Sequence, residues 1–145
     1  MYRVRDGEVE ALLVHPGGPF WKKKDAGAWF IPKGELNENE EALAAAKREF
    51  EEETGLEPHG ALHSLGSVTQ KSGKLVLAWA FEGDCDPAQI TSNTFSIEWP
   101  PKSGREQVFP EIDRAQFFNF EQAKEKMHWG EFPLFERLLE TLKQK

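Results

Sequence analysis

Short apolar runs, separated by glycine, proline and polar clusters, predict strands and helices in alternation along the chain. EVEALLVHP predicts a strand, and AWFIP predicts a second, shorter strand that ends at Pro32. ALHSLGSVTQ and KLVLAWAFEG predict a hairpin joined at KSG, and TFSIEWP and AQFFNF predict further strands. PPKSGREQVFPEID predicts a long polar loop, and FEQAKEKM and PLFERLLETLKQK predict amphipathic helices.

One more helix is predicted from about Glu40 to Thr54. Asn37 or Asn39 is expected as its N-cap and Gly55 as its C-cap. Because no repeat or linker interrupts the pattern, we expect a single domain over residues 1–145, with helices on both faces of a sheet.

Composition places the chain among globular proteins, with 39% hydrophobic and 30% charged residues in a length of 145. No apolar run approaches the roughly 20 residues that span a bilayer, and no signal peptide is visible. We therefore expect no membrane partner and a cytoplasmic location. The single Cys85 excludes an internal disulfide and a cysteine zinc site.

The net charge of −7 disfavours long nucleic acid as a partner. Small phosphorylated ligands remain compatible with an acidic chain, because metal ions can lie between the two sets of negative charge. A homodimer also remains open at this stage.

The predicted helix over residues 40–54 concentrates negative charge beside its apolar face. At 100° per residue, Leu43 and Phe50 share the inward stripe, and Glu49, Glu52 and Glu53 lie next to it, with Glu53 closest. Like charges in this arrangement raise one another's pKa, and a hard divalent cation such as Mg²⁺ would remove that cost. From charge alone, a solvated acidic face is the competing interpretation.

The spacing of residues around this helix is more specific than its charge. In order, the fixed positions are Gly34, Glu40, Arg48, Glu49, Phe50, Glu52, Glu53, Gly55 and Leu56. This pattern resembles the Nudix box, G-x5-E-x7-R-E-U-x-E-E-x-G-U with U an apolar residue, and every fixed position matches.

The resemblance implies an α+β fold, an α/β/α sandwich with a mixed β-sheet between helices. It implies hydrolysis of a nucleoside diphosphate linked to another moiety, in which water attacks a phosphorus of the pyrophosphate link with Mg²⁺ or Mn²⁺ as cofactor. Nudix domains usually begin with a full strand, and here we expect that first strand to be truncated to MYRVR.

Carried onto this chain, the resemblance assigns the metal ligands to the box. Glu49, Glu52 and Glu53 correspond to the ligand positions, and the backbone carbonyl of Lys33 or Gly34 would complete the metal shell.

The resemblance also indicates the catalytic residues. Arg48 would orient Glu49 or another box carboxylate through a charge-assisted hydrogen bond. A general base is still required, and the candidates are Glu52 and Glu53 in the box and Glu111 in the long polar loop, with Glu106 as its competitor. The four histidines show no metal-ligand spacing and receive no catalytic role.

Substrate-binding candidates lie before the box and in the aromatic-rich segments. WFIPKG resembles the form found in dinucleoside polyphosphate hydrolases and some nucleoside triphosphate pyrophosphohydrolases, where Lys33 would face a phosphate. Lys24, in the run KKK, would add positive charge, and Trp29 and Trp99 are candidates for stacking on a base. Further stacking candidates are Phe20, Trp21 and Phe95.

NTFSIEWPPKSGREQVFPEIDRAQFF resembles a bacterial subgroup of predicted nucleoside triphosphate pyrophosphohydrolases. The sequence therefore predicts a Mg²⁺-dependent hydrolase that cleaves a phosphoanhydride bond in nucleoside polyphosphates, of the dinucleoside polyphosphate or nucleoside triphosphate type, by metal-activated water. The alternative is a nucleotide-binding sensor or scaffold on the same fold without turnover.

Overall fold

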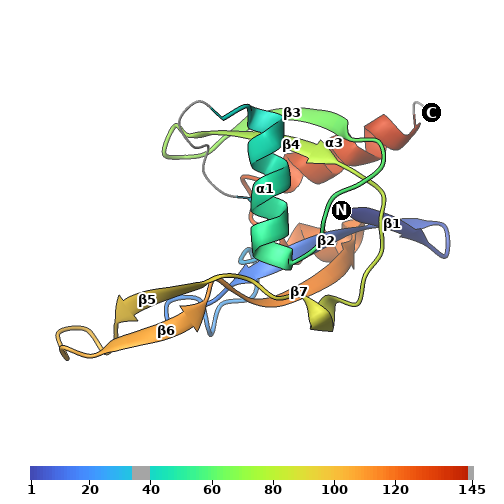
Figure 1. Cartoon of the computed structure of the whole chain (residues 1–145). Helices are drawn as coiled ribbons and strands as arrows, with labels where there is room; N and C mark the ends of the chain where they lie inside the picture. Colours follow the sequence, from blue (N-terminus) through green and yellow to red (C-terminus); the bar gives the residue numbers. More distant parts are fainter. Residues whose placement is uncertain (34–39, 144–145) are drawn as a thin grey trace.

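The computed structural model describes residues 1–33 and 40–143. Figure 1 shows the elements in order. They are β1 (Tyr2–Arg5), β2 (Glu8–Pro16), α1 (Ala42–Thr54), β3 (His63–Thr69), β4 (Leu75–Ala80), a 3-10 turn η1 (Pro87–Gln89), β5 (Thr94–Glu98), β6 (Glu106–Pro110), β7 (Ile112–Asn119), α2 (Phe120–Lys126) and α3 (Phe132–Lys143). Within this described part, no helix is long and apolar enough to cross a membrane.

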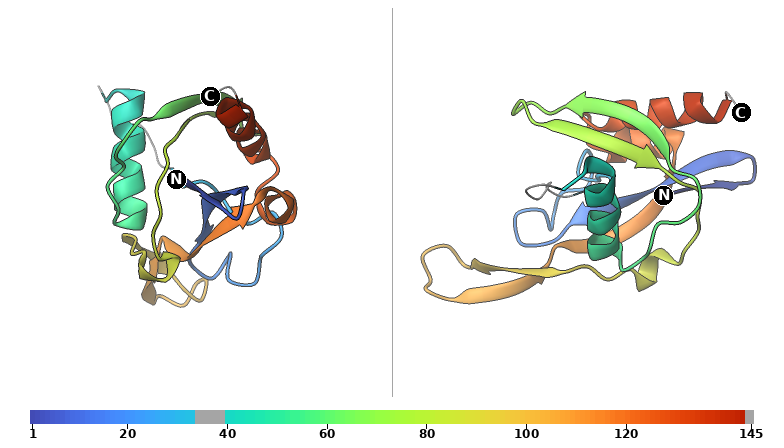
Figure 2. Two further views of the ribbon diagram at one scale, coloured as in Figure 1. Left: turned by 90° about the vertical axis from the view of Figure 1, so that its right-hand side faces the viewer. Right: turned by 45° about the horizontal axis from the view of Figure 1, so that its top comes forward.

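The molecule is layered, with α1 on one side of the central strands and α2 and α3 on the other (Figure 2). The described strands form antiparallel sheets in the orders β1-β2-β7, β3-β4 and β5-β6. Parallel pairing enters through the bridges Tyr2–Glu82 and Trp29–Met127. The first of these joins β1 to the end of β4, where the Tyr2 N–H donates to the Phe81 carbonyl over 3.0 Å. The expected α+β sandwich is confirmed.

Two segments differ from the sequence-based expectation. AWFIP forms no strand, because only Trp29 and Phe30 make isolated bridges, to Met127 and Val14 respectively. The expected long loop before β7 instead contains β6, paired in register with β5. Much of β6 is exposed, so it lacks the apolar alternation that marks a half-buried strand.

Helix α1 begins two residues later than predicted, at Ala42, with Glu41 as an N-cap that makes no side-chain capping bond. Asn37 and Asn39, the expected caps, lie outside the described residues. The C-terminus is as predicted: Gly55 has φ 76° and ψ 6°, the left-handed conformation that glycine adopts without a Cβ penalty. The buried face of α1 carries Phe50, whose ring packs edge-on against Phe81 at 5.2 Å.

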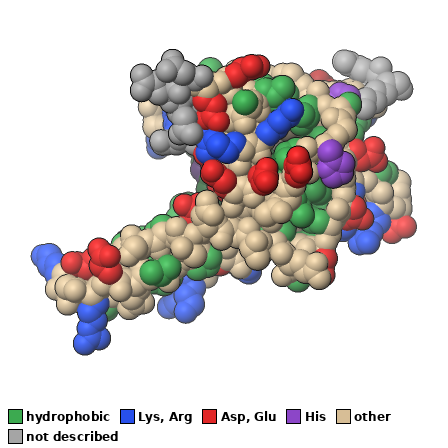
Figure 3. Space-filling view, viewed as in Figure 1, with side chains coloured by type: hydrophobic (Ala, Val, Ile, Leu, Met, Phe, Trp, Pro, Cys, Tyr) green, Lys and Arg blue, Asp and Glu red, His purple; other side chains and the backbone are tan. Residues whose placement is uncertain are grey.

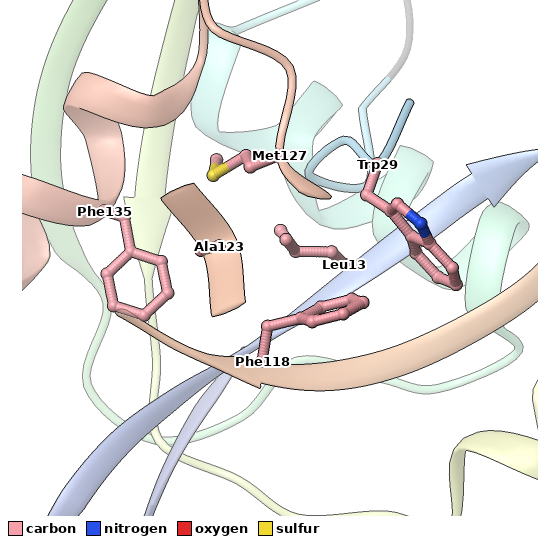
Figure 4. Packing of buried hydrophobic residues seen from close by; sticks show 6 residues of the cluster. All are labelled: Leu13, Trp29, Phe118, Ala123, Met127 and Phe135. Carbon is pink, nitrogen blue, oxygen red and sulfur yellow. The ribbon is translucent and has the colours of Figure 1, made fainter. Parts of the chain in front are cut away.

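The core on the α2–α3 side is built from β2, β7 and the helices, and Figure 4 shows one of its clusters. This cluster consists of Leu13, Trp29, Phe118, Ala123, Met127 and Phe135. Trp29, expected as a substrate-binding residue, is only 3% exposed. Its ring packs against Phe118 at 4.9 Å and its Nε1 donates to Asp25 over 2.9 Å. A ring so enclosed cannot stack on a base, so we withdraw that assignment.

A cavity of about 490 Å³ lies between α1, β2, β4 and α3. Its walls are largely apolar and include Leu12, Phe50, Val76 and Leu134. Met1 and Tyr2 line it as well, at the start of the four-residue β1. Helix α1 therefore borders this cavity with the face that carries Phe50, and the carboxylate-bearing Glu49 lines it too.

The β5–β6 hairpin projects from the body as an arm (Figures 1 and 2). Its base is fixed where the Gly17 N–H donates to the Glu111 carbonyl over 2.8 Å. Gly17 lies so close to the arm that a Cβ there would collide with the Pro110 carbonyl oxygen, which is main chain and cannot turn aside. This close approach fixes the position of Glu111, directly before β7.

We predict that Gly17→Ala destabilises the fold by about 2–3 kcal/mol, because the backbone of the arm must move to admit the methyl group. Gly27→Ala is the control: nothing lies within 4 Å of its Cβ position, and its φ of +69° makes the cost about 1 kcal/mol of backbone strain alone. Urea unfolding of both variants measures the difference. Equal losses would contradict the close approach at Gly17.

Candidate active site

Arg48 on α1 is surrounded by carboxylates, and Figure 3 shows acidic side chains gathered over this helix with basic ones among them. Its Nε and Nη2 donate to the two oxygens of Glu40 over 2.8 and 2.9 Å. Its Nη1 donates to Glu49 over 2.7 Å and to Glu52 over 3.1 Å. These hydrogen bonds, to Glu40 first and then Glu49, raise the pKa of Arg48 above its already high value. The guanidinium is thus a permanent counter-charge within the box.

Glu53 occupies a different environment. Its Oε2 accepts a hydrogen bond from the main-chain N–H of Lys33 over 2.8 Å. Burial raises the pKa of Glu53 to about 7; the Lys33 hydrogen bond and charge oppose this rise, and the charges of Glu49 and Glu111 add to it. Near neutral pH the metal-free protein therefore holds this carboxyl partly protonated, unlike an ordinary glutamate.

Of the two loop candidates for a general base, Glu111 lies at the base of the arm, directly before β7. Its backbone N–H donates to the Asn93 carbonyl over 2.8 Å, and its carbonyl accepts from Gly17. Its charge adds, less than that of Glu49, to the raised pKa of Glu53. Glu106 instead lies along the arm, where its carboxylate accepts from the Ser96 hydroxyl over 3.0 Å.

Lys33 joins the box to the C-terminal part of the chain. Its Nζ lies 2.7 Å from Oε2 of Glu131, a residue only 1% exposed. The other oxygen of Glu131 accepts from the Ile31 N–H over 2.9 Å. Glu131 directly precedes α3, where the positive end of the helix dipole favours a carboxylate. Sequence reasoning missed Glu131, and the available signal was a lone acidic residue opening an apolar helix.

The remaining substrate candidates are spread over the 17–28 loop and the arm. The Lys24 Nζ lies 4.9 Å from the centre of the Trp21 ring, and the Lys24 carbonyl is 2.7 Å from Nε2 of the buried His15. Trp99 meets Phe20 edge-on at 5.5 Å, at the junction of arm and loop. Gly34, expected near the metal, lies outside the described residues.

The box offers the donor chemistry of a hard divalent cation, because Glu49, Glu52 and Glu53 supply only carboxylate oxygens from one helix. Across residues 1–33 and 40–143, no three acidic, histidine or cysteine groups converge closely enough to hold an ion as placed. The reason is visible in the contacts: Glu49 and Glu52 are turned toward Arg48. Cation binding would therefore require these two side chains to exchange part of their contact with Arg48 for the metal.

We predict that Glu53→Gln stabilises the metal-free protein at pH 8 by about 1–3 kcal/mol. The native carboxyl has a folded pKa of about 7, above its value of 4.5 when exposed, so the folded state binds more protons in this range and loses stability as pH rises through it. Glutamine imitates the protonated form, so the advantage should fade toward pH 4.5.

Chemical denaturation in a chelator, repeated from pH 4.5 to 8.5, measures this dependence. Glu51→Gln, at an exposed position of the same helix, is the control and should show little change. A stabilisation by Glu53→Gln that stays constant across pH would argue against a raised pKa at Glu53.

We also predict that Glu131→Gln destabilises the protein by about 1–3 kcal/mol, because the buried Lys33 ion pair would be lost and an amide N–H could face the ammonium where a carboxylate oxygen now lies 2.7 Å from it. Glu136→Gln, exposed on α3, is the matched control. Urea unfolding at pH 7 separates the two, and similar midpoints would show that the buried pair adds nothing.

The fold of the chain is similar to that of several solved structures. A C. elegans Ap4A hydrolase in a binary complex matches with a TM-score of 0.67 and 20% identity, over 99% of this chain and 95% of that chain. The NUDIX domain of Shewanella oneidensis NrtR, complexed with ADP ribose, matches with a TM-score of 0.64 and 15% identity, over 97% and 82%. The E. coli ORF135 protein matches with a TM-score of 0.57 and 21% identity, over 99% and 88%. At these identities the likeness concerns the fold.

Comparison of the sequence with family models is more decisive. A search of curated proteins gives no significant match. The model of the NUDIX domain matches residues 1–138, which include α1 and the other elements that hold the candidate site. This chain belongs to the Nudix family.

Proposed function

We propose that the protein is a metal-dependent pyrophosphohydrolase that cleaves a phosphoanhydride bond in nucleoside polyphosphates. The observation that carries this proposal is the arrangement on α1, where Arg48 balances Glu49 and Glu52 while Glu53 is held apart and partly buried. A purely solvated acidic face would not require a buried carboxyl with a pKa raised to about 7.

Glu49, Glu52 and Glu53 would hold Mg²⁺ or Mn²⁺ in this proposal. The cation would supply neutralisation of phosphate charge and a lowered pKa for bound water. The residues of the chain contribute the rest. Arg48 orients Glu49 and Glu52, and Glu53 or Glu111 would act as the general base.

Lys33 would serve the phosphates of the substrate. Its ammonium pairs with the buried Glu131, and its main-chain N–H donates to Glu53. The position of the Lys33 cation relative to Glu53, a candidate base, is therefore fixed. Such preorganised charge is the main device by which enzymes stabilise phosphoryl-transfer transition states.

Two fold relatives give modest support for the ligand class. One is described as an Ap4A hydrolase and the other was solved with ADP ribose. Both ligands contain phosphoanhydride links, which agrees with a nucleotide whose phosphate chain meets the box. We place dinucleoside polyphosphates and nucleoside triphosphates ahead of nucleotide sugars, because Lys33 and Lys24 suit several phosphates.

We predict that Glu52→Gln and Glu53→Gln each lower kcat by roughly 100-fold or more, since each removes a carboxylate charge from the proposed metal site. Glu51→Gln is the control, because Glu51 is an exposed neighbour on the same helix. Phosphate products are measured with Mg²⁺ on a panel of diadenosine tetraphosphate, standard and oxidised deoxynucleoside triphosphates, ADP-ribose and nucleoside diphosphate sugars.

Cleavage of one class, lost in both variants and kept in Glu51→Gln, would support the proposal and name the substrate. Native-like turnover in Glu52→Gln and Glu53→Gln would refute the assignment of the metal site. Nucleotide binding without turnover on any substrate would favour the sensor alternative.

A further inference from the structure

Four aromatic rings form a continuous line beside the box, here called the aromatic row: Trp21, Phe30, His128 and Trp129. Trp21 meets Phe30 edge-on at 5.5 Å. Phe30 stacks on His128 at 5.0 Å with 21° between planes, and His128 stacks on Trp129 at 5.5 Å with 28°. The last three rings therefore form a stack in which each successive pair is tilted by less than 30°.

His128, whose ring is the middle one of this stack, is held by three main-chain hydrogen bonds and by one to the ring itself. The His128 N–H donates to the Trp29 carbonyl over 2.8 Å, and its own carbonyl accepts from the Glu131 and Phe132 N–H groups. Its Nδ1 accepts from the Gly130 N–H over 3.2 Å. These contacts hold the imidazole plane in place before any ligand arrives, which is the condition for a preorganised binding surface.

Trp129 ends the stack at the surface. It is 68% exposed, the highest value among the large hydrophobic residues described as exposed. An isolated surface tryptophan is unremarkable, but this one extends a rigid stack of aromatic rings and leaves most of its own ring in solvent. A ring in that position offers stacking area with little entropy left to lose on binding.

The row also reaches the candidate active site. The Lys33 Nζ lies 4.5 Å from the centre of the Phe30 ring, and the Lys33 N–H is bound to Glu53. The Lys24 Nζ lies over Trp21 at the other side of Phe30. Two lysine ammonium groups thus lie beside the aromatic row, although the net charge of the protein is −7. Rings beside cations match a ligand that joins a planar base to a phosphate chain.

We propose that the exposed ring of Trp129, supported by His128, is the stacking platform for a nucleobase of the substrate. The proposal rests on the proposed function and deepens it, because it assigns the base end of the ligand while Lys33 meets the phosphates. Stacking uses the face that every base possesses, so the platform favours purines over pyrimidines by ring area and distinguishes little within either group.

The test measures binding rather than turnover. Trp129→Ala should weaken the binding of α,β-methylene ATP with Mg²⁺ by roughly 5- to 100-fold, the range expected for loss of one base–aromatic stack. Binding of inorganic tripolyphosphate, which has no base, should stay as in the native protein. Trp129→Phe keeps an aromatic face and should recover most of the affinity for the nucleotide.

Val108→Ala is the matched control, since Val108 is 67% exposed but lies on β6, outside the aromatic row. Isothermal titration calorimetry gives the affinities, and thermal unfolding checks that each variant folds. Native affinity for the nucleotide in Trp129→Ala, an equal loss for both probes, or no nucleotide binding by the native protein would each overturn the platform.

The outcomes separate the platform from the proposed function. Nucleotide binding that depends on Trp129 in a protein that hydrolyses nothing would retain the platform and reject the hydrolase. Hydrolysis with native nucleotide affinity in Trp129→Ala would retain the hydrolase and reject the platform.

Discussion

The network centred on Arg48 is the interaction on which the candidate site depends. Glutamates three and four residues apart on a helix repel one another, and α1 could not carry them cheaply without an internal cation. Arg48 provides one through a bidentate contact with Glu40 and single contacts with Glu49 and Glu52. The same network gathers these carboxylates around a single guanidinium.

Glu53 differs from the carboxylates that contact Arg48. It lies closer to the packed side of α1 and is served by a main-chain N–H rather than by a guanidinium. A neutral dipole compensates a carboxylate less than a full charge does, so burial prevails and the pKa of Glu53 rises. The box therefore combines carboxylates of two kinds: those in contact with Arg48, and Glu53, whose pKa burial raises to about 7.

Much of this could be predicted from sequence because it is local. Spacing within two dozen residues is enough to predict α1 and its end at Gly55. It also predicts that Glu49, Glu52 and Glu53 lie on one side of the helix. Glu131 and Trp129 could not be predicted, since their role depends on packing the α2–α3 connection against residues about one hundred positions earlier. Local pattern also misled at Trp29: it borders the loop expected to meet the phosphates, and only the tertiary fold closes the core around it.

The hydrogen bond from Lys33 to Glu53 affects which substitutions position 33 can accept. Its donor is the main chain, so the bond is encoded by the path of the polypeptide and not by the identity of the side chain at position 33. Replacing the lysine would affect its contact with Glu131 while leaving this bond available, and proline alone among the amino acids would remove the donor. Position 33 thus has two separable requirements. Any residue except proline can donate the backbone bond to Glu53, whereas the contact with Glu131 needs a side chain that carries an ammonium.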